Sequence, residues 1–372
     1  MLISLIIPVY NRPQETEELL ESLALQTRSD FETVIVEDGS SPDSTSEAVA
    51  ERYRNRLDIT YVIRPNGGPA AARNTGVAAA RGDFFIITDS DCVLPPGYMA
   101  AVYEAVERGD VEFFGGPDMA APDFSPLQKA VSYSMTSPFT TGGIRGRKRA
   151  AGGFSPRSFN LGVSRRVFWL VGGFSDMRIG EDIDFSLRIM EQGIEARFLP
   201  EAAVCHKRRT SFRQFFKQVF IFGTARVNLG FRHRSARKVV YLLPALFTVG
   251  SAAMYVAAAC SSPWFLFSSA AAAALWSLSG TGTVCGLLLV SFMSLYAPWW
   301  FSVPFGALML LWLVDSARAN QSLQIGWLSV WTSFIQLYGY GLGFLYGLWM
   351  RVVLRRDEPY TYRVTGMFAR RK

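Results

Sequence analysis

The stretch that most constrains the fold is an apolar run that ends directly in acidic residues. Residues 84–87, Phe-Phe-Ile-Ile, are aromatic and β-branched, which is typical of a strand buried on both faces of a parallel sheet. Asp89 and Asp91 follow at once, and ligands of open α/β sheets bind beyond the carboxyl ends of the strands. Alternate residues of an extended segment face the same way, so both carboxylates can reach one hard cation, Mg²⁺ or Mn²⁺. The alternative is a solvated loop after a strand.

The segments before this run repeat the order of strand followed by helix. We expect strands at residues 2–9, 33–36 and 59–63, and helices beginning at Pro13 and after Ser41. This alternation predicts a right-handed parallel α/β sheet. Polar residues that end the first two strands are then expected at the same sheet edge as the two carboxylates; they are Asn11, Glu37 and Asp38.

The third expected strand is followed by a segment of small residues, Asn-Gly-Gly-Pro-Ala-Ala-Ala-Arg-Asn-Thr-Gly at residues 66–76. Glycine and alanine allow a ligand to approach the backbone closely, and Arg73 supplies a permanent charge. The segment is neither G-x-G-x-x-G nor a P-loop, which argues against nicotinamide and P-loop sites. A helix of small residues packed tightly on the sheet is the alternative.

Five motifs, in this order and at these distances, resemble the nucleotide-sugar half of family 2 glycosyltransferases of GT-A fold. They are Pro-Val-Tyr-Asn at 8–11, Glu-Asp-Gly-Ser at 37–40, the small-residue segment, Asp-Ser-Asp at 89–91, and a downstream set with Phe-Asn-Leu-Gly at 159–162, Val-Gly-Gly-Phe at 171–174 and Gly-Glu-Asp-Ile-Asp at 180–184. The resemblance covers roughly residues 1–205. Glu37 departs from the family, which usually has an Asp there, so either Glu37 or Asp38 meets the base.

The resemblance implies a nucleotide-sugar donor, most often a uridine diphosphate sugar, and a divalent metal, Mn²⁺ or Mg²⁺, on its diphosphate. Asp91 with Asp89 would hold the metal. His206 is a further candidate ligand, and a structural role is its alternative. The residues expected around the donor are Pro8, Tyr10, Asn11, Glu37, Asp38, Gly68, Arg73, Asn74, Asp89 and Ser90.

A predicted helix over residues 180–190 begins with acidic residues. Acids in a first helical turn are favoured by the helix dipole alone, which is the alternative to a catalytic role. The family resemblance implies that Asp182 is the general base toward the acceptor hydroxyl, with Glu181 supporting it. One base and direct displacement imply inversion at the anomeric carbon.

Residues 129–157 form the least interpretable stretch, with basic residues at Arg145, Arg147, Lys148 and Arg149. A long basic loop beside an active site is favoured as a lid or phosphate contact, and a solvated connection is the alternative.

The second half of the chain is unlike the first. Residues 239–314 contain no Asp, Glu, Lys or Arg, and mean hydropathy is +0.16 overall. We therefore predict about four transmembrane helices over residues 239–350, as spans at 239–260, 263–279, 284–314 and 326–350.

Basic residues flank the uncharged run. Ten Lys or Arg lie in residues 207–238 and seven follow Met350, which indicates cytoplasmic flanks and a multi-pass inner-membrane protein with a cytoplasmic catalytic domain. Residues 206–238 are expected as basic amphipathic helices in the membrane interface, with a core helix as the alternative, and residues 351–372 as a basic tail. Nucleic-acid binding is not expected.

The sequence thus predicts an α/β GT-A domain with a Rossmann-like mixed sheet over residues 1–205, followed by an all-α transmembrane region. The predicted function is inverting, metal-dependent glycosyl transfer to a lipid-linked acceptor, either a polyprenyl carrier or an envelope glycan. The alternatives are a processive polysaccharide synthase and a non-catalytic scaffold of an envelope assembly machine.

Overall fold

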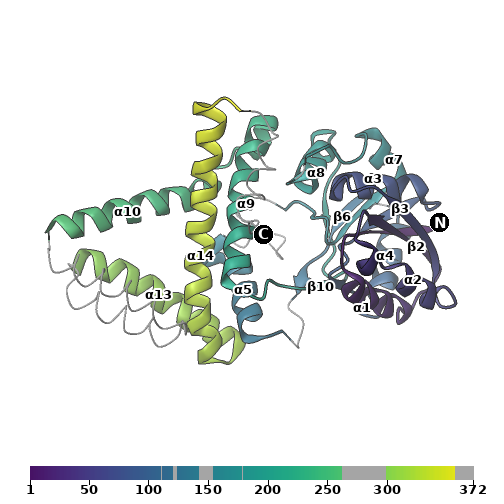
Figure 1. Cartoon of the computed structure of the whole chain (residues 1–372), viewed down its shortest axis with the longest axis horizontal. Coiled ribbons are helices and arrows are strands. Elements are labelled where there is room, and N and C mark those ends of the chain that lie inside the picture. The colour runs from purple at the N-terminus through teal and green to yellow at the C-terminus, as the bar shows by residue number, and fades with distance from the viewer. Residues whose placement is uncertain (110, 120–123, 142–153, 178, 262–298, 357–372) are drawn as a thin grey trace.

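The computed structural model describes residues 1–356 except 110, 120–123, 142–153, 178 and 262–298 (Figure 1). The N-terminal part is built on a seven-stranded sheet of order β3-β2-β1-β4-β8-β6-β9. The strands are β1 (Ile3–Val9), β2 (Phe31–Asp38), β3 (Asp58–Arg64), β4 (Phe84–Ile87), β6 (Phe113–Gly115), β8 (Leu161–Ser164) and β9 (Arg197–Phe198).

The first four strands are parallel, whereas β8 is antiparallel to both of its neighbours, β4 and β6. The sheet is therefore mixed, and the predicted Rossmann-like α/β core is confirmed. The four strands expected from the sequence all form. Strand β1 lies between β2 and the central strand β4, with Ile3 opposite Phe31 on one side and Phe84 on the other, so the acidic residues after β4 emerge beside the end of β1.

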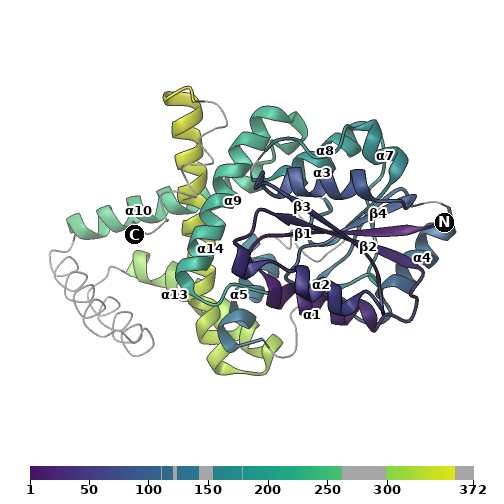
Figure 2. The ribbon, with the colours of Figure 1, turned by 45° about the vertical axis from the view of Figure 1, so that its right-hand side comes forward.

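Helices cover both faces of this sheet (Figure 2). One face packs on α1 (Pro13–Ala24), α2 (Glu47–Tyr53) and α4 (Tyr98–Glu107), and the other on α3 (Pro69–Ala79), α7 (Arg165–Leu170) and α8 (Glu181–Glu191). Alternation along β1 explains the two cores, because Leu5 and Ile7 join the first and Ile6 the second. Burial on both faces accounts for the continuous apolar strands.

A small second sheet brings together residues 92–93 and 204–206, which are far apart in the sequence. It has the order β5-β10-β7, with β5 at Cys92–Val93, β10 at Val204–His206 and β7 at Asp118–Met119. His206 pairs with Cys92 in the antiparallel register. The histidine therefore lies next to the acidic segment that ends β4.

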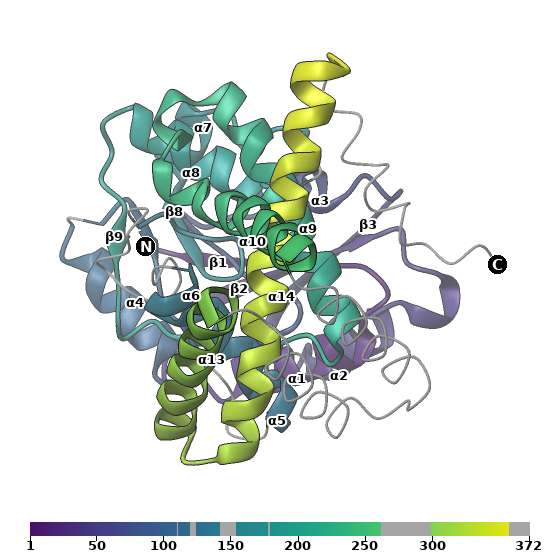
Figure 3. The ribbon, with the colours of Figure 1, turned by 90° about the vertical axis from the view of Figure 1, so that its left-hand side faces the viewer.

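The remaining helices form a separate layer beside the carboxyl ends of the strands (Figures 1 and 3). They are α5 (Pro126–Thr136), α6 (Pro138–Thr141), α9 (Phe212–Arg232), α10 (Leu243–Ser261), α13 (Trp299–Asn320) and α14 (Leu323–Leu348). Helices α9 and α14 lie side by side because glycines face the partner backbone. A Cβ on Gly223 would lie 2.1 Å from the Tyr340 carbonyl oxygen, and one on Gly343 would lie 2.0 Å from that of Phe220.

The predicted transmembrane region is not supported. In the part of the chain that the structure describes, no helix has both the length and the hydropathy needed to cross a membrane. The all-α transmembrane part of the predicted fold class and the predicted multi-pass inner-membrane location are therefore wrong. Residues 262–298, where one span and half of another were expected, lie outside the described residues.

The physical reason is that an uncharged segment is not necessarily a strongly apolar one. Helix α14 contains Gln324 and Gln336 and is rich in Gly, Ser, Trp and Tyr, which have low hydropathy. Asp315, which falls between the predicted spans 284–314 and 326–350, lies within α13 and accepts a hydrogen bond of 2.7 Å from the Tyr133 hydroxyl of α5. These helices pack on one another and on α5.

Candidate functional site

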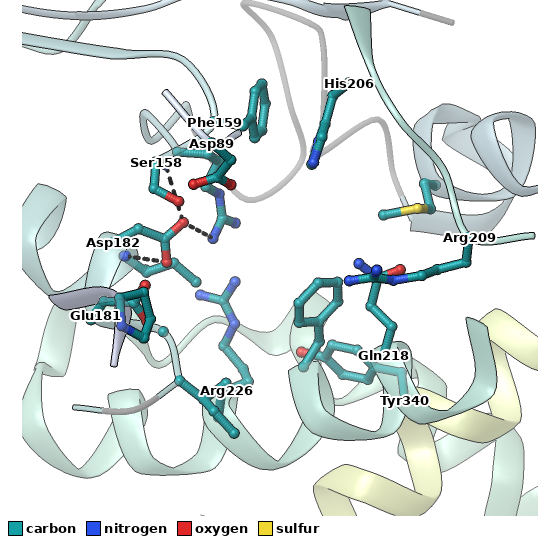
Figure 4. Close-up of a pocket in the computed structure, with 18 of the residues that line it drawn as sticks. Asp89, Ser158, Phe159, Glu181, Asp182, His206, Arg209, Gln218, Arg226 and Tyr340 are labelled. Carbon is teal, nitrogen blue, oxygen red and sulfur yellow. Dashed lines mark hydrogen bonds and ion pairs between the residues drawn. The ribbon is translucent and has the colours of Figure 1, made fainter. Parts of the chain in front are cut away.

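A cavity of about 1090 Å³ lies between the carboxyl ends of the strands and the helical layer (Figure 4). The turns after β1, β2 and β4 form one wall, and the start of α8 forms another. Helices α5, α6, α9, α10 and α14 contribute the rest, including Phe222, Phe247 and Tyr340. The cavity is therefore a joint product of the α/β core and the helical layer.

Asp91 is held between Arg12 and His206 at the end of β4. Its carboxylate forms an ion pair with Arg12 and accepts a contact of 3.2 Å from Nε2 of His206. Burial raises the pKa of Asp91, but the His206 hydrogen bond and the Arg12 charge outweigh it and hold that pKa well below its usual range. Asp91 is therefore ionised across the physiological range.

His206 is fixed from its other side. Its ring stacks on Phe159 at 5.2 Å, and its Nδ1 lies 4.0 Å from Asp118, which forms a buried ion pair of 2.7 Å with Arg208. These neighbours hold the ring so that Nε2 faces Asp91.

The residues around Asp91 fit a hard divalent cation. Among the described residues, Asp91, Cys92 and His206 each offer a ligand atom, and these atoms lie within 4.8 Å of one another. Burial raises the pKa of the Cys92 thiol well above its usual value, so it stays protonated and is a poor ligand. The carboxylate and the imidazole remain, and they suit Mn²⁺ or Mg²⁺ with further oxygen ligands.

Arg73 links the two acidic motifs. It is buried, with Nη1 2.5 Å from Glu181 and Nη2 2.9 Å from Asp89. Burial raises the pKa of Glu181 to about 7, although the Arg73 charge opposes the shift. The Glu181 carboxyl group is therefore occupied by its contact with Arg73. Because Arg73 also contacts Asp89, it links the start of α8 to the turn after β4.

Asp182 lines the cavity, and backbone amides orient its carboxylate. One oxygen accepts a hydrogen bond of 2.8 Å from the Ile183 amide, and the other lies 3.5 Å from the Ser158 amide and 4.0 Å from Arg157 (Figure 4). Gly180, just before the helix, has a φ of +82°, which favours glycine. The turn thus presents Asp182 to the cavity.

Most of the residues expected around a donor do line this cavity. They are Pro8, Tyr10, Asp38, Gly68, Arg73, Asp89 and Ser90, together with Asp91, Glu181, Asp182 and His206.

Three expected residues do not line it: Asn11, Glu37 and Asn74. The Glu37 carboxylate accepts hydrogen bonds of 2.7 Å from the Ser46 amide and from the Tyr61 hydroxyl, so it braces the turn after β2. Asn74 exchanges hydrogen bonds of 2.8 and 2.9 Å with the backbone of Phe174. The side chain of Asn11 accepts one of 2.8 Å from the Ser41 amide.

The choice between the two acids that end β2 therefore favours Asp38. Its carboxylate accepts hydrogen bonds of 3.0 Å from the Gly67 amide and 2.8 Å from the Gly68 amide, and it forms an ion pair of 2.5 Å with Arg64. Asp38 fixes the small-residue segment against the cavity, whereas Glu37 is buried behind it.

Several cavity residues were not anticipated from the sequence. Arg12 follows the first motif directly and could have been noticed there. Those of the helical layer carry no local signal; they include Gln218, Arg226, Gln336 and Tyr340. Arg209 lies just before α9, and Arg157 ends the basic stretch at 129–157 that was favoured as a lid or phosphate contact. The basic residues Arg145, Arg147, Lys148 and Arg149, where a lid was favoured, lie outside the described residues.

Comparisons with known proteins bear on the α/β part. Residues 4–168 match the family model described as glycosyl transferase family 2. The uncharacterized glycosyltransferase EpsJ of Bacillus subtilis is 37% identical over 115 residues, 31% of this chain and 33% of that protein. Glycosyltransferase AglE of Haloferax volcanii is 26% identical over 254 residues, 67% of this chain and 80% of that protein.

One solved structure supports the fold. The mannosyltransferase PcManGT from Pyrobaculum calidifontis, in complex with GDP-Man and Mn²⁺, superposes with a TM-score of 0.52 at 22% identity, covering 78% of this chain and 85% of that one. The chain spans only 33% of EpsJ and 63% of an uncharacterized glycosyltransferase of Haemophilus influenzae. Residues 4–168 thus resemble glycosyl transferase family 2, and the superposition supports a GT-A-like mixed α/β fold; the matches say nothing of a membrane-bound type.

Proposed function

We propose that this protein is an inverting, metal-dependent glycosyltransferase that moves a sugar from a nucleotide-diphosphate sugar to an acceptor hydroxyl. One observation carries the proposal. The acidic pair after β4 and the acidic pair that begins α8 line the same cavity, and Arg73 joins them by ion pairs of 2.9 and 2.5 Å. A leaving diphosphate and an attacking hydroxyl need these two kinds of carboxylate on opposite sides of one sugar.

The donor would lie along the turns after β1, β2 and β4. Asp38 and the segment at Gly68 would lie beside the nucleoside, and Pro8 and Tyr10 would flank it. We favour a uridine diphosphate sugar by the family resemblance. PcManGT was crystallised with GDP-Man, so the transfer assay should include both uridine and guanosine diphosphate sugars.

Asp91, Asp89 and His206 would hold the divalent cation, because Nε2 of His206 is already 3.2 Å from Asp91 and Arg12 marks a position that favours positive charge. When bound, such a cation stabilises the negative charge that develops on the leaving diphosphate. Arg73 would position Asp89 for this role. The structural neighbour PcManGT was crystallised with Mn²⁺.

Asp182 would act as the general base. The Ile183 amide holds one carboxylate oxygen at 2.8 Å, which leaves the carboxylate oriented toward the cavity. Glu181 is unsuited to this role because it is buried against Arg73. As the acceptor oxygen attacks the anomeric carbon, its proton passes to Asp182 and the bond to the diphosphate breaks on the opposite face. The product therefore has inverted configuration.

We propose a lipid-linked acceptor, either a polyprenyl carrier or an envelope glycan attached to lipid. The support is the apolar character of the cavity beyond Asp182, where Phe222, Phe247 and Leu337 form the wall. A processive synthase would need a path for a growing glycan, and a scaffold would not need both acidic pairs.

The test is a transfer assay with full-length protein and a panel of radiolabelled UDP- and GDP-sugars, with a bacterial lipid extract as acceptor. We expect Mn²⁺- or Mg²⁺-dependent release of one nucleoside diphosphate and labelled lipid with an inverted linkage. Activity that persists in excess chelator, or a retained linkage, would contradict the mechanism. Failure to bind or hydrolyse any nucleotide sugar would favour the scaffold alternative.

A further inference from the structure

Three hydrogen-bond donors from separate elements converge at one end of the cavity. They are Arg157, Arg226 of α9 and Tyr340 of α14. Figure 4 shows Arg226 on the same side as Glu181 and Asp182, with the Tyr340 hydroxyl directed toward it. The Arg226 guanidinium stacks on the Tyr241 ring at 3.9 Å from its centroid, which fixes its direction.

The cluster carries more positive than negative charge. Within the described ranges, the nearest carboxylate to Arg157 is Asp182 at 4.0 Å, and Arg226 has no ion-pair partner. The buried Tyr340 hydroxyl oxygen lies within hydrogen-bonding reach of the Arg226 guanidinium, and among the described residues its own proton has no acceptor. Burying unbalanced charge and unsatisfied donors costs free energy. A bound anion would remove that cost.

The shifts in pKa agree with a dry and cationic environment. Burial lowers the pKa of Arg157, although Asp182 opposes the shift. Burial also raises the pKa of Tyr340 to about 12, with both arginines acting against it. Tyr340 therefore stays a neutral donor.

An apolar surface continues from this cluster. It consists of Phe222 of α9, Leu243, Pro244 and Phe247 of α10, and Leu337 of α14 (Figure 3 shows the three helices together). No charged residue lies among these five. A ligand that reaches the arginines from this side must be compatible with aliphatic and aromatic side chains.

We propose that Arg226, Tyr340 and Arg157 bind a phosphate-type anionic group of the acceptor, while the apolar surface binds an adjoining hydrocarbon portion. This inference rests on the proposed function and narrows its acceptor to an amphipathic molecule with an anion close to the reacting group. The donor diphosphate is not the anion concerned. The proposed metal ligand His206 lies across the cavity from Arg226 (Figure 4).

The test is direct binding by titration calorimetry with full-length protein. The probes are octyl phosphate, octyl glucoside and inorganic phosphate, each below any micelle concentration. Octyl phosphate is expected to bind at least about tenfold more tightly than either of the others, because each of those supplies only half of the interaction. Equal affinity for octyl glucoside would overturn the anion site, and equal affinity for inorganic phosphate would overturn the apolar one.

Arg226→Gln is expected to weaken octyl phosphate binding about tenfold or more, and Arg226→Lys by less, because a hydrogen bond to a charged group is lost in the first and partly kept in the second. Arg213→Gln is the matched control, since Arg213 is exposed on the same helix and does not line the cavity. Unchanged octyl phosphate binding in Arg226→Gln would refute the proposal.

Nucleoside diphosphate binding, measured for every variant, separates the two proposals and reports on folding. Retained nucleotide binding in Arg226→Gln shows that the variant is folded. Arg226-dependent octyl phosphate binding in a protein that transfers no sugar would contradict the proposed function and leave this subsite standing. The converse result, transfer without such binding, would contradict the subsite alone.

Discussion

Replacing Arg73 with Gln should reveal how much the buried link between the two acidic motifs contributes to stability. The Arg73 side chain is 4% exposed and Glu181 is 9% exposed, so the substitution leaves a carboxyl group buried beside no cation of its own. Breaking such a pair typically costs about 3–5 kcal/mol if the remaining group stays charged. Glu181 can avoid part of this cost by taking up a proton.

Because Glu181 can take up a proton, the loss of stability in Arg73→Gln depends on pH. The pKa of Glu181 is already raised to about 7, above about 4.3 in an unfolded chain, so in the wild type stability falls as pH rises between these values and levels off above 7. Without Arg73 the pKa rises further, and stability keeps falling by roughly 1.4 kcal/mol for each pH unit until the new pKa is reached. Buried Glu residues reach a pKa of about 8–9. Since the wild type still loses a few tenths of a kcal/mol above pH 7, the variant should lose about 1–1.5 kcal/mol more, relative to wild type, at pH 8.5 than at pH 7.

Urea unfolding of the wild type, Arg73→Gln, Glu181→Gln and the double variant at both pH values measures this directly. The additional loss at pH 8.5 should vanish in the double variant, because an amide side chain in place of the carboxyl group has no proton to release. A difference between Arg73→Gln and wild type that is the same at both pH values would refute the reasoning, and so would a pH dependence that survives in the double variant.

Three other substitutions test the site and the helical layer. Asp91→Ala should abolish metal-dependent transfer, and an Asp91→Ala enzyme fully active in excess chelator would show that the metal assignment is wrong. Asp182→Asn should slow turnover by about 10²–10⁴-fold while donor affinity stays nearly intact, and a loss confined to donor affinity would exclude the base role. Gly223→Ala should lower the free energy of unfolding by about 1–3 kcal/mol, because its Cβ would meet the Tyr340 carbonyl oxygen at 2.1 Å; an unchanged urea midpoint would contradict this close packing.

The sequence by itself determined the α/β core and the acidic ends of its strands. Residues 84–87 are apolar because β4 is buried on both faces, and this local pattern is visible without any partner strand. The same holds for the acids after β4 and at the start of α8. The order of strands and helices also predicted that the polar residues after β1, β2 and β4 lie at one edge of the sheet, because parallel strands end at a common edge. The acids at the start of α8 were placed at the same site only by the family resemblance.

Other assignments needed the tertiary structure. Glu37 and Asp38 are neighbours in the sequence, yet Glu37 accepts a hydrogen bond from the Ser46 amide behind the turn after β2, whereas Asp38 lines the cavity. Neighbouring residues of a strand point to opposite faces, and nothing local states which face holds the ligand. The uncharged run from residue 239 gave a wrong prediction for a similar reason, since the absence of charge does not say whether a helix packs on lipid or on protein.

The acceptor side of the cavity depends wholly on tertiary structure. Arg157, Arg226 and Tyr340 come from three segments that no repeat or motif connects, and they meet because α9 packs on α14 through Gly223 and Gly343. Periodicity describes one face of one helix, whereas the meeting of distant side chains is decided by which helices can approach each other closely. The sequence therefore determined the acidic groups at the ends of the strands, and only the packing of the helical layer decided which side chains face them across the cavity.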